Sequence, residues 1–254
     1  MTGQNGDRRL QEDEGGAPAP QADGRKTSPS AGRDRLRLHV LTDRALSRGR
    51  TDAVIAEAAL SGGASVIQLR AKNDTGAVLV GTGHILRTIT RMHGGLLIVD
   101  DRIDIALIVD ADGAHVGQDD IPARAARRLL GPQRILGVSA HTVEEARRAE
   151  DDGADYVGFG PVFATATKGD AGPARGLDAL RDACRALTIP VVAIGGITRW
   201  NAAEVIAAGA SGLAVISVVV GADDVAGETG FLHNIVSKGG GHTGPAHVPP
   251  LGAG

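Results

Sequence analysis

The stretch VVAIGGITRWNAAEVIAAGASGLAVIS, residues 191–217, contains the pattern that decides the fold. It opens with a short apolar run, VVAIGG, and closes with another, GLAVIS. Between them the amphipathic segment NAAEVIAAGA reaches a glycine just before the second run, which is a typical helix stop. Two short apolar runs joined through a helix indicate a β-α-β unit with parallel strands.

The same unit recurs along the chain, with helical segments such as DAVIAEAALSGG and VEEARRAEDDGAD between the apolar runs. Eight such units in about 200 residues predict a single (β/α)8 TIM barrel, an α/β fold. An open doubly wound sheet is the alternative, but no predicted strand leads into a G-x-G-x-x-G turn that opens a helix. The predicted strands are LHVLT (38–42), SVIQLR (65–70), LLIV (96–99), AHVG (114–117), ILGVS (135–139), YVGFG (156–160), VVAIGG (191–196) and GLAVIS (212–217).

Both ends of the chain have a different composition from the middle. Residues 1–34 are rich in Gly, Asp, Arg, Pro, Ala and Gln, and the last seventeen residues read KGGGHTGPAHVPPLGAG. Such segments bury too little apolar surface to offset the entropy of ordering. We therefore predict disordered tails at 1–34 and 238–254, and one barrel domain at 35–237.

The bulk composition limits the partners and the compartment. Hydrophobic residues make up 42% of the chain and aromatic residues 2%, so the core must consist of Ala, Val, Ile and Leu. The net charge of −3 with mixed signs predicts neither a nucleic-acid partner nor a membrane surface. The chain has one cysteine, Cys184, and its N-terminus lacks the apolar segment of a signal peptide. We expect a cytoplasmic protein with an inert thiol, and the composition is compatible with a homo-oligomer.

Seven aspartates lie in the stretch 99–120, and the barrel rule sorts them. Catalytic groups of TIM barrels lie where strands end, whereas the opposite face serves stability. Asp100 and Asp101 follow the third predicted strand, and Asp119 and Asp120 follow the fourth. Carboxylates gathered at one mouth repel one another unless a cation compensates them, and Mg²⁺ suits such a site. Helix capping is a rival role for them, and simple solvation or turn formation is expected for Asp104, Asp110 and Asp112.

Other strand ends carry groups that fit phosphates. Alternation along an extended segment places Gln68, Arg70 and Lys72 on one side, where two cations invite an anion. Surface charge is the plain alternative. Thr165, Thr167 and Lys168 occupy a polar loop after the sixth strand, which by composition could equally be an ordinary loop. Backbone N–H groups after strands seven and eight, at Gly195-Gly196 and Ile216-Ser217, can bind a second phosphate, although the glycines could also form turns.

These segments resemble one family, thiamine-phosphate synthase, from about residue 36 to 237. The resemblance rests on QLRAK, LLIVDDRIDIA, ADGAHVGQDD, GVSAHT, DYVGFGPVFATATKGDAGP, VVAIGGIT and AVIS. It implies that 4-amino-2-methyl-5-(diphosphooxymethyl)pyrimidine is condensed with a thiazole monophosphate, giving thiamine phosphate and diphosphate. The thiazole could be 4-methyl-5-(2-phosphoethyl)thiazole or its carboxylated form.

The resemblance also implies roles for individual residues. The segment Gln68, Leu69, Arg70, Ala71 and Lys72 would bind the pyrimidine diphosphate, together with Asp100, Ser139 and Lys168. Asp101 and Asp120 would hold Mg²⁺. The thiazole phosphate would meet Thr165, Ala166 and Thr167, and the backbone of Gly196, Ile216 and Ser217. Arg70, Lys72, Ser139 and Lys168 would be catalytic, since the implied reaction is a dissociative displacement that needs stabilisation of the leaving diphosphate and no protein nucleophile.

Three positions depart from the family pattern. Asp100 stands where the family usually has Asn, Ala71 where it has Glu, and Ala164 where it has Pro. Asp100 adds a negative charge beside a diphosphate, so either the metal compensates it, or the carboxyl is protonated, or affinity falls.

Two other functions fit parts of the pattern. A thiazole tautomerase of similar barrel shape would use the monophosphate subsite and His141 as an acid–base group, without a metal. A non-catalytic barrel would bind thiazole phosphate and release no diphosphate. His39 and His115, within strands, are expected to be hydrogen-bonded interior residues.

Overall fold

A computed structural model describes Met1 and residues 35–165, 167 and 172–239. The two predicted tails lie outside these residues, apart from Met1 and the two residues 238–239. Two predicted site residues, Ala166 and Lys168, lie outside them as well.

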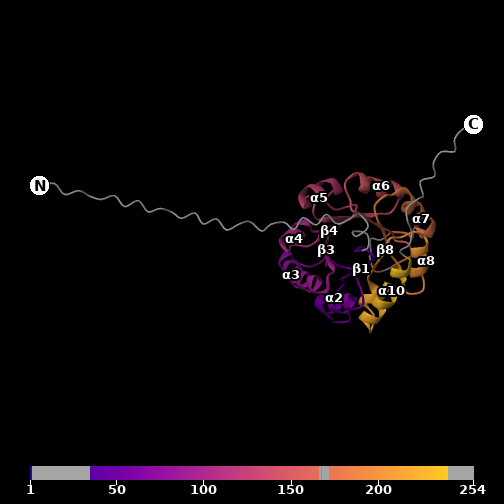
Figure 1. The fold of residues 1–254 in the computed structure, drawn as a ribbon, viewed down its shortest axis with the longest axis horizontal. Coiled ribbons are helices and arrows are strands. Elements are labelled where there is room, and N and C mark those ends of the chain that lie inside the picture. Colours follow the sequence, from indigo (N-terminus) through magenta and orange to yellow (C-terminus); the bar gives the residue numbers. More distant parts are fainter. Residues whose placement is uncertain (2–34, 166, 168–171, 240–254) are drawn as a thin grey trace, which may run out of the picture.

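Eight parallel strands form a closed barrel in the order β1-β2-β3-β4-β5-β6-β7-β8, which confirms the predicted fold (Figure 1). β1 pairs with β2 on one side and with β8 on the other, so the sheet has no edge. The strands are β1 (Leu38–Leu41), β2 (Val66–Leu69), β3 (Leu96–Asp100), β4 (Gly113–Val116), β5 (Ile135–Ala140), β6 (Tyr156–Phe159), β7 (Val191–Ile194) and β8 (Gly212–Val215).

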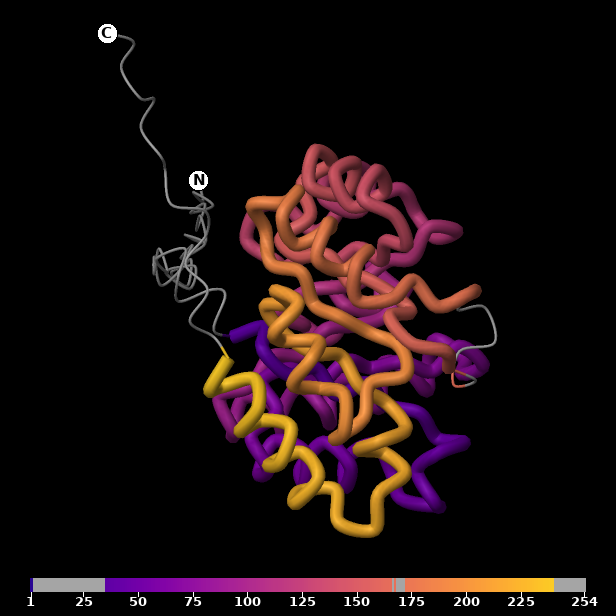
Figure 2. The backbone as a smooth tube through the Cα atoms, turned by 90° about the vertical axis from the view of Figure 1, so that its right-hand side faces the viewer, coloured from indigo at the N-terminus to yellow at the C-terminus, as the bar shows by residue number. Residues whose placement is uncertain are grey.

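Helices surround the barrel and cover its outer face (Figure 1). The last of them, α10 (Val225–Gly239), packs against α8 and α2, as Figure 2 shows where the yellow end of the described chain meets the indigo beginning. The other helices are α2 (Asp52–Ser61), α3 (Gly76–His93), α4 (Ile103–Ile108), α5 (Ala123–Leu130), α6 (Val143–Asp151), α7 (Gly176–Ala186), α8 (Ala202–Ala207) and α9 (Ser217–Val220).

The strands are buried on both faces, as the composition predicts for a parallel sheet. Leu, Ile, Val and Ala fill the core, and Tyr156 and Phe159 are its largest fully buried side chains. Several helices begin at a threonine that accepts a hydrogen bond from the backbone, as at Thr142, whose hydroxyl accepts from Glu145 N at 3.2 Å. Glu145 returns a bond to the backbone N–H of His141 rather than of Thr142. Together these two bonds resemble a capping box displaced by one residue.

Carboxylates at the opposite face from the strand ends serve stability. Asp112 accepts from the backbone N–H of Leu97 at 2.8 Å and pairs with Arg87 at 2.6 Å. The expectation that Asp112 is merely solvated or part of a turn was therefore wrong, because its carboxylate fixes the start of β3. Asp104 and Asp110 are exposed and form surface ion pairs, in line with the sequence.

Cys184 is half-buried in α7, and burial raises the pKa of its thiol to about 12. A thiol with so high a pKa is a poor nucleophile at neutral pH, which agrees with the inert role predicted from the sequence. Among the described helices, none combines the length and the apolar character needed to cross a bilayer.

The close approach of β4 and β5 gives a test of the packing. A Cβ at Gly113 would lie 2.0 Å from the Ile135 carbonyl oxygen, so Gly113→Ala should lower the free energy of unfolding by about 1–3 kcal/mol. At Gly81, on the exposed face of α3, an added Cβ meets nothing within 4 Å. Gly81→Ala should raise stability by about 0.5–1 kcal/mol because alanine favours helices. Urea unfolding of the two variants measures both effects. An unchanged midpoint for Gly113→Ala would contradict the close approach of β4 and β5 at this position.

Candidate active site

Cavities open where the strands end, on the face that the barrel rule predicts. A glycine-lined pocket of about 590 Å³ lies over β5 to β8, and an acidic cavity of about 580 Å³ lies at the ends of β2 and β3. A smaller inner cavity of about 290 Å³ lies inside the barrel, and Ser139 lines both it and the glycine-lined pocket. The acidic cavity is lined by Ala71, Lys72, Asp74, Leu79, Asp100, Asp101 and Arg102.

Asp101 and Asp120 come together from two neighbouring strand ends and share a hydrogen bond. Asp101 has a left-handed backbone, with φ of 62°, and its N–H donates to the His115 carbonyl of β4 at 2.8 Å. Asp120 accepts from the Gly117 N–H at 2.7 Å. A positive φ on a residue other than glycine carries a small energetic cost, and the bond to β4 holds Asp101 in this conformation.

The pKa of Asp101 is raised by its surroundings, which favours a proton or a cation at this pair of carboxylates. Burial, the charge of Asp100 and the contact with Asp120 raise the pKa of Asp101 to about 7, while Lys72 opposes the rise. The two carboxylates therefore share a proton or meet a cation near neutral pH.

The described part of the chain has no cluster of three or more His, Cys, Asp or Glu side chains that could bind a metal. Two carboxylates nonetheless fit Mg²⁺, which fills its other positions with water and substrate phosphates. A zinc-type site with three or four protein ligands does not fit these residues.

Asp100 is buried and compensated by neighbours within the protein. Its carboxylate accepts from Gln68 Nε2 at 2.5 Å and lies 3.7 Å from Arg70 Nε. Arg70 also pairs with Asp43 at 3.3 Å, so its guanidinium lies between two carboxylates. The extra negative charge at position 100 thus has a cationic partner. The Nε atom of Arg70 is buried and has no hydrogen-bond partner among the described residues.

The remaining residues of the β2 segment point in different directions. Lys72 is exposed and lines the acidic cavity beside Asp101. Leu69 is fully buried in the core and Ala71 packs against it, so any contact of Leu69 with a ligand would have to come from its backbone. Gln68 and Arg70 both contact Asp100, with Gln68 inside the barrel, while Lys72 lies at the rim, so a common ligand for the three stays a prediction.

Ser139 ends a line of polar side chains inside the barrel. Its hydroxyl lies 2.9 Å from His115 Nε2, and His115 Nδ1 lies 3.0 Å from the Tyr156 hydroxyl. His115 is thus hydrogen-bonded, as predicted. His39 has a hydrogen bond to the backbone of Leu36, as predicted, whereas its buried Nε2 has no partner among the described residues. Burial and the nearby His115 lower the pKa of His39 to about 3, so the ring is neutral.

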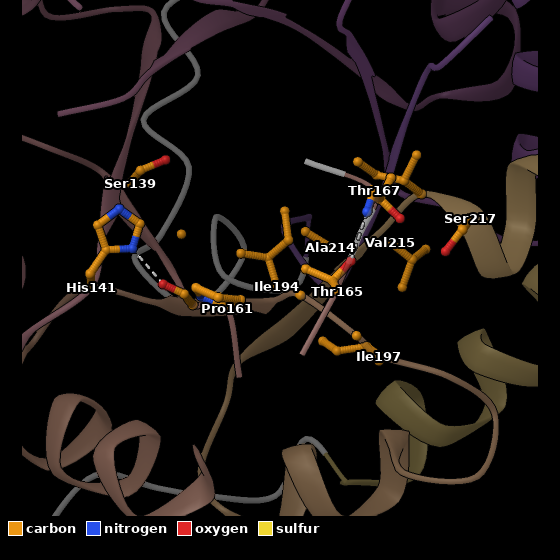
Figure 3. Close-up of a pocket in the computed structure, with 15 residues that line it drawn as sticks. Ser139, His141, Pro161, Thr165, Thr167, Ile194, Ile197, Ala214, Val215 and Ser217 are labelled. Carbon is orange, nitrogen blue, oxygen red and sulfur yellow. Dashed lines mark hydrogen bonds between the residues drawn. The ribbon is translucent and has the colours of Figure 1, made fainter. Parts of the chain in front are cut away.

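The glycine-lined pocket joins the loops after β6, β7 and β8. Ser139 and His141 lie on one side of it and Thr165, Thr167 and Ser217 on the other (Figure 3). The Thr165 hydroxyl accepts from the Thr167 N–H at 3.2 Å, and His141 Nδ1 lies 2.6 Å from the Gly160 carbonyl. Gly196 and Ile216 complete the predicted set in the wall.

The two glycines after β7 are required by backbone geometry. Gly195 and Gly196 have φ of 97° and 65°, and a Cβ on either would lie within 3 Å of the loop that follows β6. Asn201 fixes the turn, since its side chain donates to the Gly196 carbonyl at 3.0 Å and accepts from the Thr198 N–H at 2.7 Å. The glycines therefore serve the turn and the pocket wall together.

Sequence reasoning missed three residues near the site. Asp43 comes two residues after the end of β1, so the strand-end rule that selected Asp100 could also have found it. Tyr156 lies within an apolar strand, where only its hydroxyl distinguishes it from a core residue. Asn201 stands before a helix and resembles an ordinary cap. The sequence carries no signal for the loop contacts of Asn201 or for the histidine contact of Tyr156.

Comparisons with known proteins give a consistent result. A family model described as thiamine monophosphate synthase matches residues 38–219. The chain is 53% identical over 201 residues to a thiamine-phosphate synthase of Chloroflexus aurantiacus, an alignment that covers 79% of this chain and 93% of the relative. A thiamine-phosphate synthase of Moorella thermoacetica is also 53% identical, with 79% and 96% covered.

Solved structures agree. The thiamine phosphate pyrophosphorylase of Pyrococcus furiosus superposes with a TM-score of 0.76 at 43% identity, covering 82% of this chain and 98% of that protein. A 3-hexulose-6-phosphate synthase, at 19% identity and a TM-score of 0.57, shares the fold alone. On the family match and these identities, the chain belongs to the thiamine monophosphate synthase family.

Proposed function

We propose that this chain transfers the pyrimidinylmethyl group of 4-amino-2-methyl-5-(diphosphooxymethyl)pyrimidine to the ring nitrogen of a thiazole monophosphate. The products are thiamine phosphate and diphosphate. One observation carries the proposal: the acidic cavity and the glycine-lined pocket share one barrel mouth, in a chain of this family. Two substrates that react with each other need adjacent subsites.

The acidic cavity suits the diphosphate and its metal. Asp101 and Asp120 would bind Mg²⁺, because the raised pKa of Asp101 beside Asp120 marks a place where positive charge is needed. Lys72 lines the same cavity, and the buried Nε of Arg70 lacks a hydrogen-bond acceptor that a phosphate oxygen could supply. Lys168 would join them from outside the described residues.

The glycine-lined pocket suits the thiazole phosphate. Thr165 and Thr167 offer hydroxyl groups, and Gly196, Ile216 and Ser217 offer backbone N–H groups in the wall. Small residues let the backbone approach a phosphate closely, as in other phosphate-binding barrels. Ala166, in the same loop, lies outside the described residues. Apolar walls at Ile194 and Ile197 suit a thiazole ring.

The chemistry follows from charge. The C–O bond to the diphosphate breaks, the bonding electrons leave with the diphosphate, and the thiazole nitrogen then supplies its electron pair to the pyrimidine-stabilised cation. Arg70, Lys72 and Lys168 would stabilise charge that grows on the leaving group, usually a large catalytic contribution. Mg²⁺ supplies further positive charge when bound. No side chain forms a covalent bond, which agrees with the raised pKa of Cys184.

The two alternative functions explain less of the site. A thiazole tautomerase would need neither the Asp101–Asp120 pair nor Arg70, and the relatives reported above carry the synthase name. The composition supports a cytoplasmic location without nucleic-acid or membrane partners. The carboxylated and non-carboxylated thiazoles, and a homo-oligomer, are compatible with what the described residues show.

An assay of the full chain tests the proposal. With both phosphorylated precursors and Mg²⁺, we expect diphosphate release and thiamine phosphate in equal amounts. Chelation of Mg²⁺ should abolish both. Isomerisation of the thiazole without Mg²⁺ would identify a tautomerase instead, and thiazole binding without diphosphate release would identify a non-catalytic barrel.

The metal site is tested by thermal unfolding with Mg²⁺ and inorganic diphosphate. Together these should raise the Tm of the native chain, and Asp101→Asn or Asp120→Asn should remove most of the shift. Asp119→Asn is the matched control, because Asp119 is an exposed neighbour. An equal loss in the control, or none in the other two, would contradict the assignment.

The metal response should also depend on pH. With the pKa of Asp101 near 7, protons compete with the cation, so the Mg²⁺ concentration that gives half of the Tm shift should fall from about pH 6 to about pH 8.

Without a cation, the stability of the folded protein should fall as the pH rises. The folded state holds this proton more tightly than the unfolded chain, so its stabilising contribution is lost as pH rises through about 7. A pH-independent Mg²⁺ requirement would contradict the prediction.

Asp100→Asn tests whether the extra charge has its own role. The amide oxygen of asparagine can still accept from Gln68, and loss of the charge should lower the pKa of Asp101. We expect kcat/KM equal to or above that of the native chain, most clearly below neutral pH. A loss of more than about tenfold, or about 1.4 kcal/mol, would show that Arg70 needs the Asp100 carboxylate.

A further inference from the structure

A line of hydrogen bonds runs from the barrel interior to the Ser139 hydroxyl. The phenol of Tyr156 on β6 lies 3.0 Å from His115 Nδ1, and His115 Nε2 lies 2.9 Å from Ser139 Oγ. Tyr156 is 1% exposed and His115 7% exposed, so water has little access to compete for these bonds. Side chains held in this way keep one orientation.

The neighbouring strands make room for this line. A Cβ at Gly137 of β5 would lie 2.2 Å from Tyr156 Cζ and 2.4 Å from His115 Nδ1. A Cβ at Gly158 of β6 would lie 2.9 Å from His115 Cε1. Glycine weakens a strand interior and often marks a close approach. Here both glycines leave space for the same imidazole ring.

The line of bonds has one arrangement of protons that satisfies the buried phenol. Burial raises the pKa of Tyr156, so its phenol is neutral and has a hydrogen to donate. Within the described residues, His115 Nδ1 is the partner recorded for this hydroxyl, and it accepts that hydrogen in one of the two neutral tautomers of the ring. In that tautomer the imidazole proton resides on Nε2 and points to Ser139 Oγ. With its oxygen already accepting, Ser139 directs its own hydrogen elsewhere.

The backbone of Ser139 contacts the loop that carries Asp120, one of the residues proposed for the metal. Gln118 donates from Nε2 to the Ser139 carbonyl at 2.5 Å, and Gln118 precedes Asp119 and Asp120 in the loop after β4. The Ser139 side chain also lines the glycine-lined pocket (Figure 3). A hydroxyl whose oxygen already accepts one hydrogen bond has its own hydrogen available for an anionic oxygen.

We propose that Tyr156 and His115 are positioning residues, which orient Ser139 as a hydrogen-bond donor to an oxygen of the departing diphosphate. The role of the diphosphate rests on the proposed function above, whereas the orientation of the protons does not. Charge grows on the diphosphate as the C–O bond breaks, so the Ser139 bond strengthens in the transition state. The effect therefore belongs mainly to kcat.

The first experiment needs no substrate. Nitrogen-15 NMR of the full chain labelled at histidine reports which ring nitrogen of His115 carries the proton, with His115→Gln used for assignment. The proposal predicts the Nε2–H form in the native chain and a change of that signal in Tyr156→Phe. An Nδ1–H form in the native chain, or an unchanged signal in the variant, would overturn it.

The second experiment uses kinetics. Tyr156→Phe keeps the ring and removes the hydroxyl, and should lower kcat about tenfold with KM changed less than about twofold, since one hydrogen bond to a charged group is loosened. Ser139→Ala should lower kcat by more than Tyr156→Phe does, and the double variant should have the same kcat as Ser139→Ala alone. Additive losses in the double variant would overturn the proposal.

Thr90→Val is the matched control for loss of a buried hydroxyl. Thr90 is fully buried in α3, and its hydroxyl donates to the Arg87 carbonyl at 3.1 Å. The Thr90→Val variant should be less stable than the native chain and have the same kcat. If Tyr156→Phe does not fold, the comparison of His115→Gln with His115→Leu replaces it. The glutamine amide can donate to Ser139, so it should retain more kcat, and equal activities would overturn the proposal.

The two proposals fail in different ways. A native chain that releases no diphosphate contradicts the proposed function, while the NMR result still decides the proton arrangement. A native chain that is active, beside a Tyr156→Phe variant with unchanged kcat, contradicts the positioning role and leaves the function intact.

Discussion

The repulsion between two carboxylates at the barrel mouth is the constraint on which the site depends. Asp101 donates its backbone N–H to β4, and the Asp120 carboxylate accepts from the Gly117 N–H. These two bonds hold both residues at the barrel mouth. A half-buried acidic pair of this kind keeps a proton or takes a cation. The fold thus maintains a place for positive charge, and in the proposed function a metal carrying a diphosphate would meet that need.

The other charges of the site are arranged around this pair. Arg70 lies between Asp43 and Asp100, so its charge is balanced before any ligand arrives and its orientation is fixed. Lys72 at the rim is exposed and lines the acidic cavity. Preorganised charge of this kind stabilises a leaving group without reorganisation during the reaction. In the proposed function, the apolar walls of the glycine-lined pocket would bring the thiazole nitrogen beside the carbon that the diphosphate leaves.

The sequence predicted most of the fold and part of the site. The eight strands were visible as apolar runs because parallel strands are buried on both faces, and the strand-end rule placed Asp101 and Asp120 together. The pattern could not show that Arg70 compensates Asp100, since that contact joins neighbouring strands through side-chain geometry. Nor could it show that His39 Nε2 lacks a partner while His115 is bonded twice, because both histidines occupy similar apolar strands. Those contacts depend on the two glycines that leave space around His115.

The central claim is that Asp101 and Asp120 hold a cation that in turn binds diphosphate. A crystal structure of the full chain with Mg²⁺ and diphosphate tests it most directly. The account predicts one octahedral ion within about 2.0–2.1 Å of an oxygen from each carboxylate, with diphosphate oxygens completing its shell. Diphosphate bound elsewhere, or an Asp101–Asp120 hydrogen bond that persists with no ion between the two side chains, would contradict it.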